Sequence, residues 1–143
     1  MVEVQFKPHT RKPGVYVLED YQQINSENPL RQMFLHPNIW RPPTDVFEIE
    51  EAVVVRVEIA GIREIDFSII LDKRTLYIRG LRTDTSERRA YHQIEIRYGE
   101  FISEVDLPYP VDIDKIEAIY SNGFLKITLP RAYPRQVRIS TRE

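Results

Sequence analysis

Apolar and polar residues alternate along the middle of the chain with a period of two instead of the helical 3.6. Within 53–59, for example, Val53, Val55 and Val57 fall on one side, while Arg56 and Glu58 fall on the other. Alternation of this kind is typical of β-strands with one buried face. It predicts strands over 45–51, 53–59, 67–71, 75–81, 91–97, 101–107, 116–120 and 124–129.

Turn residues between these runs indicate how the strands connect. Asn122-Gly123 separates the last two runs, and Asn-Gly supplies the two positive-φ residues of a tight hairpin turn. About eight short strands without intervening helices favour an antiparallel sandwich over an α/β design. The sequence therefore predicts an all-β fold, an antiparallel immunoglobulin-like β-sandwich.

Proline positions divide the chain into three parts. None occurs from Thr44 to Ser103, as expected for central strands, because proline lacks the amide donor of a sheet ladder. Prolines gather before this region and again at Pro130 and Pro134. We expect an N-terminal arm over 1–42, a sandwich domain over 43–130 and a C-terminal extension over 131–143.

The arm contains one predicted helix. Asn28 can cap it, Pro29 suits its first position, and Pro37 ends it. Leu30, Met33 and Phe34 have the i, i+3, i+4 spacing of one helical face. The earlier segment 15–18 is either a short strand or disordered.

Charge is balanced overall but not along the chain. The 20 Lys and Arg and 22 Asp and Glu give a net charge of -2, distributed as +1 in the arm, -6 in the sandwich and +3 in the extension. An acidic domain repels nucleic acid, so no nucleic-acid partner is expected. There is no cysteine, no apolar run of the ~20 residues that a membrane span needs, and no signal-peptide pattern, so we expect a cytoplasmic protein.

No catalytic constellation is visible in the sequence. The three histidines, His9, His36 and His92, lack metal-ligand spacing, and the scattered glycines form no phosphate-binding loop. Nucleophile motifs such as GxSxG are also absent. We therefore expect no catalytic, cofactor-binding or metal-binding residues and no enzymatic activity.

Five segments, in order and with matching spacing, resemble the α-crystallin domain of the bacterial and plant type of small heat shock proteins. They are 43–48, 53–62, 75–80, 91–101 and 123–130. The last is the most specific, because it fits the family's G-x-L-x-I/V-x-L/V-P signature through Gly123, Leu125, Ile127, Leu129 and Pro130. In this signature the glycine turns a hairpin, the three apolar residues fill the core and the proline ends the ladder.

The resemblance implies an ATP-independent holdase chaperone that works as a homodimer and as a higher homo-oligomer. Its partners would be further copies of itself and partly unfolded client proteins. The client-binding residues implied in the arm are Leu30, Met33, Phe34, Leu35, Ile39 and Trp40.

The resemblance also implies roles for two further segments. In the family, a C-terminal I/V-x-I/V motif docks on a groove at the sheet edge of a neighbouring subunit, and Val137 and Ile139 match it. A loop strand is exchanged with the partner's first strand. That strand corresponds to Tyr91, Gln93, Ile94, Glu95, Ile96 and Arg97, preceded by an exposed polar loop over 82–89.

Two alternatives remain open. One is a protein-interaction module on the same fold, either without chaperone activity or a co-chaperone that works as a monomer. The other is an enzyme, such as a carbohydrate-active sandwich, which would require a bound metal or a cleft with two carboxylates of shifted pKa.

Overall fold

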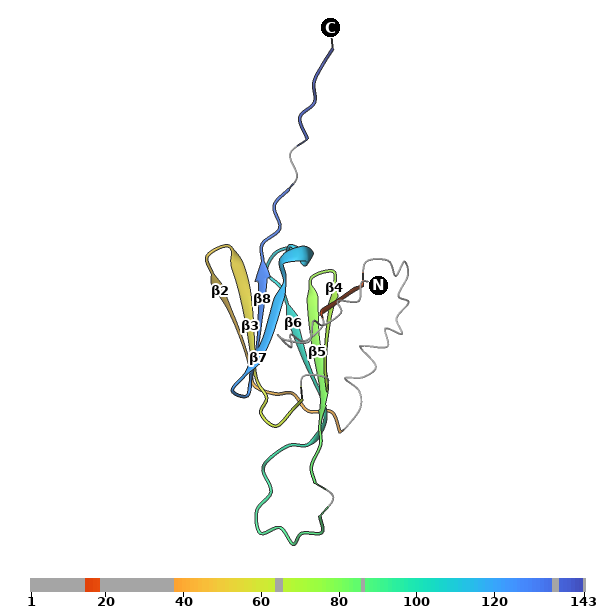
Figure 1. Ribbon diagram of the computed structural model, residues 1–143, viewed down its shortest axis with the longest axis vertical. Helices are drawn as coiled ribbons and strands as arrows, with labels where there is room; N and C mark the ends of the chain where they lie inside the picture. Colours follow the sequence, from red (N-terminus) through yellow and green to blue (C-terminus); the bar gives the residue numbers. More distant parts are fainter. Residues whose placement is uncertain (1–14, 19–37, 64–65, 86, 135–136, 143) are drawn as a thin grey trace.

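The computed structural model describes residues 15–18, 38–63, 66–85, 87–134 and 137–142, which form two facing four-stranded sheets (Figure 1). The first sheet has the order β1 (Val15–Leu18), β4 (Phe67–Asp72), β5 (Thr75–Arg82), β6 (Gly99–Asp106). The second has the order β2 (Thr44–Ile49), β3 (Ala52–Glu58), β8 (Phe124–Pro130), β7 (Glu117–Ser121). A 3₁₀ turn, Ile113–Lys115, precedes β7. The predicted β-sandwich is confirmed.

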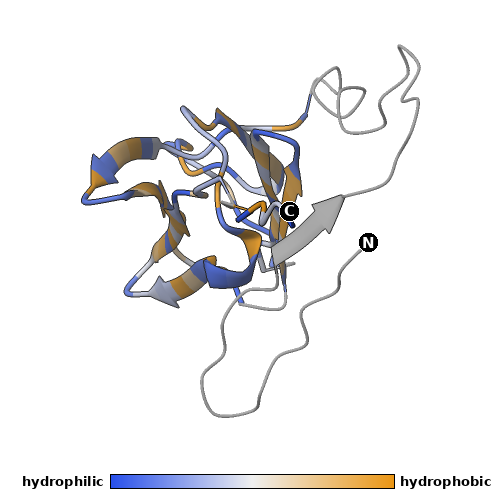
Figure 2. Cartoon of the chain, turned by 90° about the horizontal axis from the view of Figure 1, so that it is seen from above, coloured by the Kyte–Doolittle hydropathy of each residue, from blue (hydrophilic) through white to orange (hydrophobic). Residues whose placement is uncertain are grey.

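The core lies between the sheets and is built by the alternation seen in the sequence. Bands of apolar and polar residues follow one another along the strands in Figure 2. The inward residues of β3 and β8, which pair directly, are fully buried: Val53, Val55, Val57, Leu125, Ile127 and Leu129. Burying one such side chain stabilises the fold by about 1.5–3 kcal/mol, so these two central strands anchor the sandwich.

The hairpin between β7 and β8 has the predicted turn. Asn122 and Gly123 both have positive φ, 53° and 82°, as the two central residues of a tight hairpin require. The amide of Ile59 donates to the carbonyl oxygen of Gly123 at 2.8 Å, which ties this turn to the end of β3.

Gly80 in β5 is required by close packing. A Cβ atom there would lie 2.4 Å from Cζ of Phe101 and 2.6 Å from the carbonyl oxygen of Asp66. The ring of Phe101 fills this space and contacts Phe67 with 6.2 Å between ring centroids. The glycine that closes the 75–80 segment therefore makes room for a core aromatic ring.

The segment 15–18 forms β1, which pairs with β4 in parallel. The predicted strand over 91–97, in contrast, is irregular in the single chain. Its alternation is weak, and without a strand beside it no ladder can form. The predicted helix ending at Pro37 lies outside the described residues.

Candidate interaction surfaces

β2 forms an exposed edge with apolar side chains. It lies at the end of its sheet, and within the described residues its outer side pairs with no strand. Val46, Phe47 and Ile49 are all exposed there. Asp45 of this strand forms an ion pair with Arg56 of β3 at 2.8 Å, and both side chains are exposed. An edge of this kind offers unpaired backbone groups together with apolar area, which suits pairing with another strand.

The connection from β5 to β6, residues 83–98, extends beyond one end of the sandwich (Figure 1). Tyr91, Ile94 and Ile96 are 53%, 67% and 64% exposed, a high fraction for large apolar side chains. These residues belong to the segment predicted to be exchanged between subunits. The structure thus presents the 91–97 segment as accessible and without a ladder.

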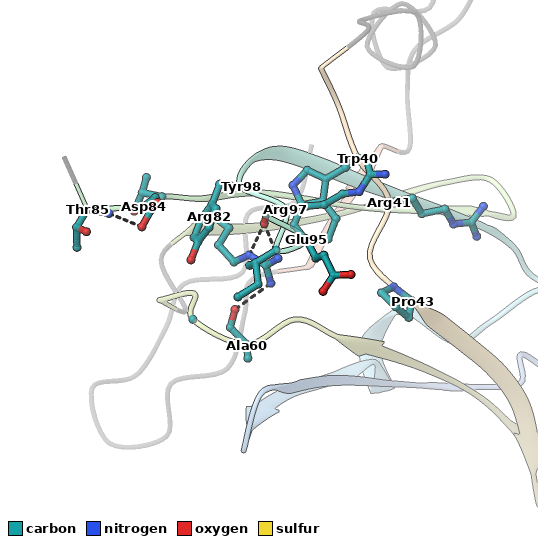
Figure 3. A pocket seen from close by; sticks show the side chains of 13 residues that line it. Trp40, Arg41, Pro43, Ala60, Arg82, Asp84, Thr85, Glu95, Arg97 and Tyr98 are labelled. Atoms are coloured by element: carbon teal, nitrogen blue, oxygen red, sulfur yellow. Dashed lines mark hydrogen bonds between the residues drawn. The ribbon is translucent and has the colours of Figure 1, made fainter. Parts of the chain in front are cut away.

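Arg82 holds the base of this connection (Figure 3). Its Nε donates to the carbonyl oxygen of Arg97 at 2.7 Å, its Nη2 donates to the same oxygen, and Nη1 donates to the carbonyl of Ala60 at 3.3 Å. The guanidinium also lies over the rings of Trp40 and Tyr98. The residues that make these contacts line a cavity of about 760 Å³ between the base of the loop and the sandwich.

A small polar cluster orders the loop further out. The carboxylate of Asp84 accepts from the Thr85 amide at 2.8 Å, from Arg89 Nη1 at 3.1 Å and from the Tyr91 hydroxyl at 3.2 Å. Desolvation pushes the pKa of Asp84 upward, but these donors outweigh it and the pKa falls below its ordinary value. The ionised carboxylate therefore holds Thr85, Arg89 and Tyr91 together at neutral pH.

The C-terminal extension leaves the sandwich at the end opposite the loop (Figure 1). Val137 and Ile139, the two apolar residues of the predicted docking motif, are 82% and 87% exposed. No described residue covers them to any large extent. Burial of these two exposed β-branched side chains in an apolar groove would be favourable, because it removes apolar surface from water.

The first residues of the extension are fastened to the turn between β2 and β3. The amide of Arg131 donates to the carbonyl oxygen of Glu51 at 2.8 Å, and the Tyr133 hydroxyl donates to the Glu51 carboxylate. The Arg131 guanidinium lies 4.7 Å from the ring centroid of Tyr109, whose pKa is raised by desolvation and by the charge of Glu48. The part of the extension that is free to move before Val137 is therefore shorter than the whole stretch between Pro130 and Val137.

The predicted client-binding residues have different placements. Leu30, Met33, Phe34 and Leu35 lie outside the described residues. Ile39 is half-buried against Tyr77 and Ile102 on the outer face of the first sheet.

Trp40 lies in the core instead of in an exposed arm. It is only 8% exposed, and its ring contacts Phe101 with 5.6 Å between centroids. Backbone bonds explain this placement: the Trp40 amide donates to Glu100 and the Ile102 amide donates to Trp40. The sandwich thus includes Trp40, ahead of the boundary expected at residue 43.

The signature residues lie in the last hairpin and in the core beneath it. Leu125, Ile127 and Leu129 are fully buried, and Gly123 occupies the hairpin turn. Pro130 is the last residue of β8 and pairs with Ala52. Among the described residues, no group of three or more His, Asp or Glu side chains is placed to hold a metal ion. The described helices include none long and apolar enough to cross a membrane.

The profile of the Hsp20/alpha crystallin family matches residues 45–141. The chain belongs to this family. Small heat shock protein C2 of Rickettsia felis is 36% identical over 92 residues, which cover 63% of this chain and 60% of that protein. The chain therefore spans somewhat less than two thirds of that relative.

Solved structures of small heat shock proteins have the same fold. The protein from Xylella fastidiosa, described as having a distinct high order structure, has a TM-score of 0.62 and 34% identity, covering 73% of this chain and 98% of that one. Heat shock protein 16.0 of Schizosaccharomyces pombe has a TM-score of 0.60 and 31% identity, covering 72% and 97%. The predicted α-crystallin family is confirmed.

Sequence reasoning missed three contacts that shape these surfaces. They are the Arg82 contacts at the loop base, the Tyr133–Glu51 bond at the start of the extension, and the pairing of β1 with β4. Each of these contacts joins residues that come close only in the folded sandwich, so no local sequence pattern indicates it. An isolated Val-x-Val at 15–17 was the only available signal for the third.

Proposed function

We propose that the chain is an ATP-independent holdase that binds partly unfolded proteins and prevents their aggregation. The observation that carries the proposal is a family fold whose single chain leaves apolar strand segments exposed at several places. Exposed apolar surface of this extent suits protein–protein contact. The proposed activity consists of binding alone, requires no cofactor, and takes place in the cytoplasm.

The proposed dimer forms by strand exchange. The 91–97 segment of one subunit pairs with the free edge of β2 in its partner, and the partner does the same in return. The accessible Ile94 and Ile96 and the exposed Val46 and Phe47 support this pairing, because both sides offer apolar area and unpaired backbone. The exchange covers two edges that would otherwise promote aggregation.

The proposed higher oligomer forms through the C-terminal extension. Val137 and Ile139 dock on a sheet edge of a neighbouring subunit and bury their side chains there. The charges favour the contact, since the extension carries a net charge of +3 and the sandwich carries -6. The short tether limits the neighbours that the motif can reach.

Client contact is proposed for the apolar residues of the arm, Leu30, Met33, Phe34, Leu35, Ile39 and Trp40. Unbranched and aromatic side chains adapt to varied apolar partners. Ile39 and Trp40 pack on the sandwich in this structure, so their contact with clients requires that the arm first leave it.

The proposed activity is tested by light scattering. A heat-labile client is warmed without ATP, alone and with a near-equal mass of this protein, and an unrelated soluble protein at equal mass serves as the control. We expect the protein to suppress aggregation and the control to leave it unchanged. Absence of suppression would refute the holdase proposal, and a monomer in light-scattering chromatography would favour the interaction module.

A further inference from the structure

The last residues of the arm are held by the beginning of β6. The Trp40 amide donates to the carbonyl oxygen of Glu100 at 3.1 Å, and the Ile102 amide donates to that of Trp40 at 3.0 Å. The indole Nε1 of Trp40 donates to the carbonyl oxygen of Gly99 at 3.3 Å, and its ring packs against Phe101. The position of Trp40 on the sandwich therefore depends on residues 99–102.

These residues follow directly after the 91–97 segment, whose end is held by Arg82. Two nitrogens of the Arg82 guanidinium donate to the carbonyl oxygen of Arg97, and the group lies over the rings of Trp40 and Tyr98 (Figure 3). The arm and the segment proposed for strand exchange thus share one small set of contacts. A change in the position of Trp40 acts on the loop through Arg82 and Gly99.

Open space lies beside this set of contacts. The cavity of about 760 Å³ is lined by Trp40, Arg82 and loop residues 95–98, and a second cavity of about 200 Å³ is lined by Ile39 and Phe101. Side chains that border a cavity lose packing contacts on that side. Residues 39 and 40 are therefore held by fewer contacts than residues enclosed within the core, and their release costs less free energy.

We propose that Trp40 is a positioning residue for strand exchange, acting through Arg82 and Gly99. While Trp40 is packed on the sandwich, it holds the base of the loop, so that the 91–97 segment extends from a fixed point toward its partner. When Trp40 leaves, Arg82 loses one of its two rings and the base of the loop loosens. The inference rests on the strand exchange and client contact put forward under the proposed function, and it adds the linkage between them.

Linkage between two equilibria is reciprocal. If packing of Trp40 strengthens strand exchange by a given factor, strand exchange strengthens packing of Trp40 by the same factor. A dimer would therefore keep Ile39 and Trp40 covered, and separation of its subunits would favour their release. Dissociation of the dimer and exposure of apolar residues for client contact would thus occur together.

Trp40 is the only tryptophan in the chain, so its fluorescence reports its surroundings without a label. The full chain is diluted stepwise, and the emission maximum is recorded alongside the mass from sedimentation. We expect the emission to shift to longer wavelength at the concentration where the dimer dissociates, because the indole becomes hydrated. With Ile94→Pro, both transitions should move together to higher concentration.

A substitution at Trp40 tests the linkage in the other direction. Trp40→Leu keeps an apolar side chain but removes the ring beside Arg82 and the donor to Gly99, and we expect the dissociation constant of the dimer to rise at least about fivefold. Arg82→Lys should have a smaller effect in this background than in the wild type, because part of its effect depends on Trp40. Phe67→Leu is the matched control. Its ring also contacts Phe101 but lies outside the base of the loop, so this variant should lower the Tm without changing the dissociation constant.

The results separate the inference from the function beneath it. An emission maximum that stays constant while the dimer dissociates, or a Trp40→Leu dimer as stable as the wild type, overturns the linkage and leaves strand exchange intact. Equal weakening of the dimer by Trp40→Leu and Phe67→Leu also overturns it, since a general loss of stability would then explain both. A dimer unaffected by Ile94→Pro refutes exchange through 91–97 and, with it, the inference. Holdase activity is measured separately on the unmodified chain, so its failure is distinguishable from each of these results.

Discussion

The guanidinium of Arg82 lies 4.4 Å from the ring centroid of Trp40, at the point where the arm, the sandwich and the 83–98 loop meet. The same group donates to the backbone carbonyls of Arg97 and Ala60. Arginine can combine these contacts because its planar fork stacks on a ring while its edges donate hydrogen bonds. Arg82 therefore fixes both ends of the loop that carries the proposed exchange segment.

Replacing Arg82 with lysine should loosen this loop without unfolding the sandwich. Lysine keeps the charge but loses the stacked plane and the double donation to Arg97, with an expected loss of about 1–2 kcal/mol. Amide hydrogen exchange in 96–100 should accelerate while exchange in β3 and β8 stays slow. Arg88→Lys, at an exposed arginine of the same loop, is the control, and equal effects of both variants would contradict the role of Arg82.

Gly80→Ala should destabilise the domain because the added methyl group meets the ring of Phe101 and the Asp66 carbonyl. Overpacking of this kind costs about 1–3 kcal/mol, which lowers the Tm of a domain this size by several degrees. Thermal unfolding of Gly80→Ala, Phe101→Leu and the double variant forms a cycle. The smaller leucine should relieve part of the crowding, so strictly additive losses would refute the steric explanation.

Removing the Tyr133 hydroxyl should free the start of the extension. Tyr133→Phe loses the bond to the Glu51 carboxylate, an exposed contact worth about 0.5–1 kcal/mol. We expect native mass spectrometry to show a broader distribution of oligomer masses, with the Tm of the sandwich nearly unchanged. Tyr98→Phe, which removes a hydroxyl at the opposite end of the sandwich and keeps the ring beside Arg82, is the control. A distribution identical to the wild type would mean that this bond does not direct the extension.

Proline at Ile94 should weaken the proposed exchanged dimer. Proline removes a ladder donor and fixes φ, and each lost ladder bond costs about 0.5–1.5 kcal/mol. The dissociation constant of the dimer, measured by sedimentation, should rise about tenfold. Ala90→Pro, in the same loop but before the predicted strand, should have a much smaller effect. An unaffected dimer in the Ile94 variant would exclude exchange through 91–97.

Sequence alone predicted the parts of the fold that depend on local patterns. The alternation around Val53–Val57 and the Asn122-Gly123 turn identified strands and a hairpin that the structure contains. The 91–97 segment shows the limit, since its alternation indicates a strand that one chain does not form. The bond from Tyr133 to Glu51 joins residues 82 positions apart, and no neighbouring pattern could have indicated it.

The two accessible segments project from opposite ends of the sandwich, the 83–98 loop from one and the Val137–Ile139 motif from the other (Figure 1). Because these two contact segments lie at opposite ends of the domain, the length or sequence of one can change without altering the other. Residues added to or removed from the tether would change the spacing and curvature of an assembly while its repeating pair stayed the same. In this architecture, a few residues outside the folded core determine the size of the assembly.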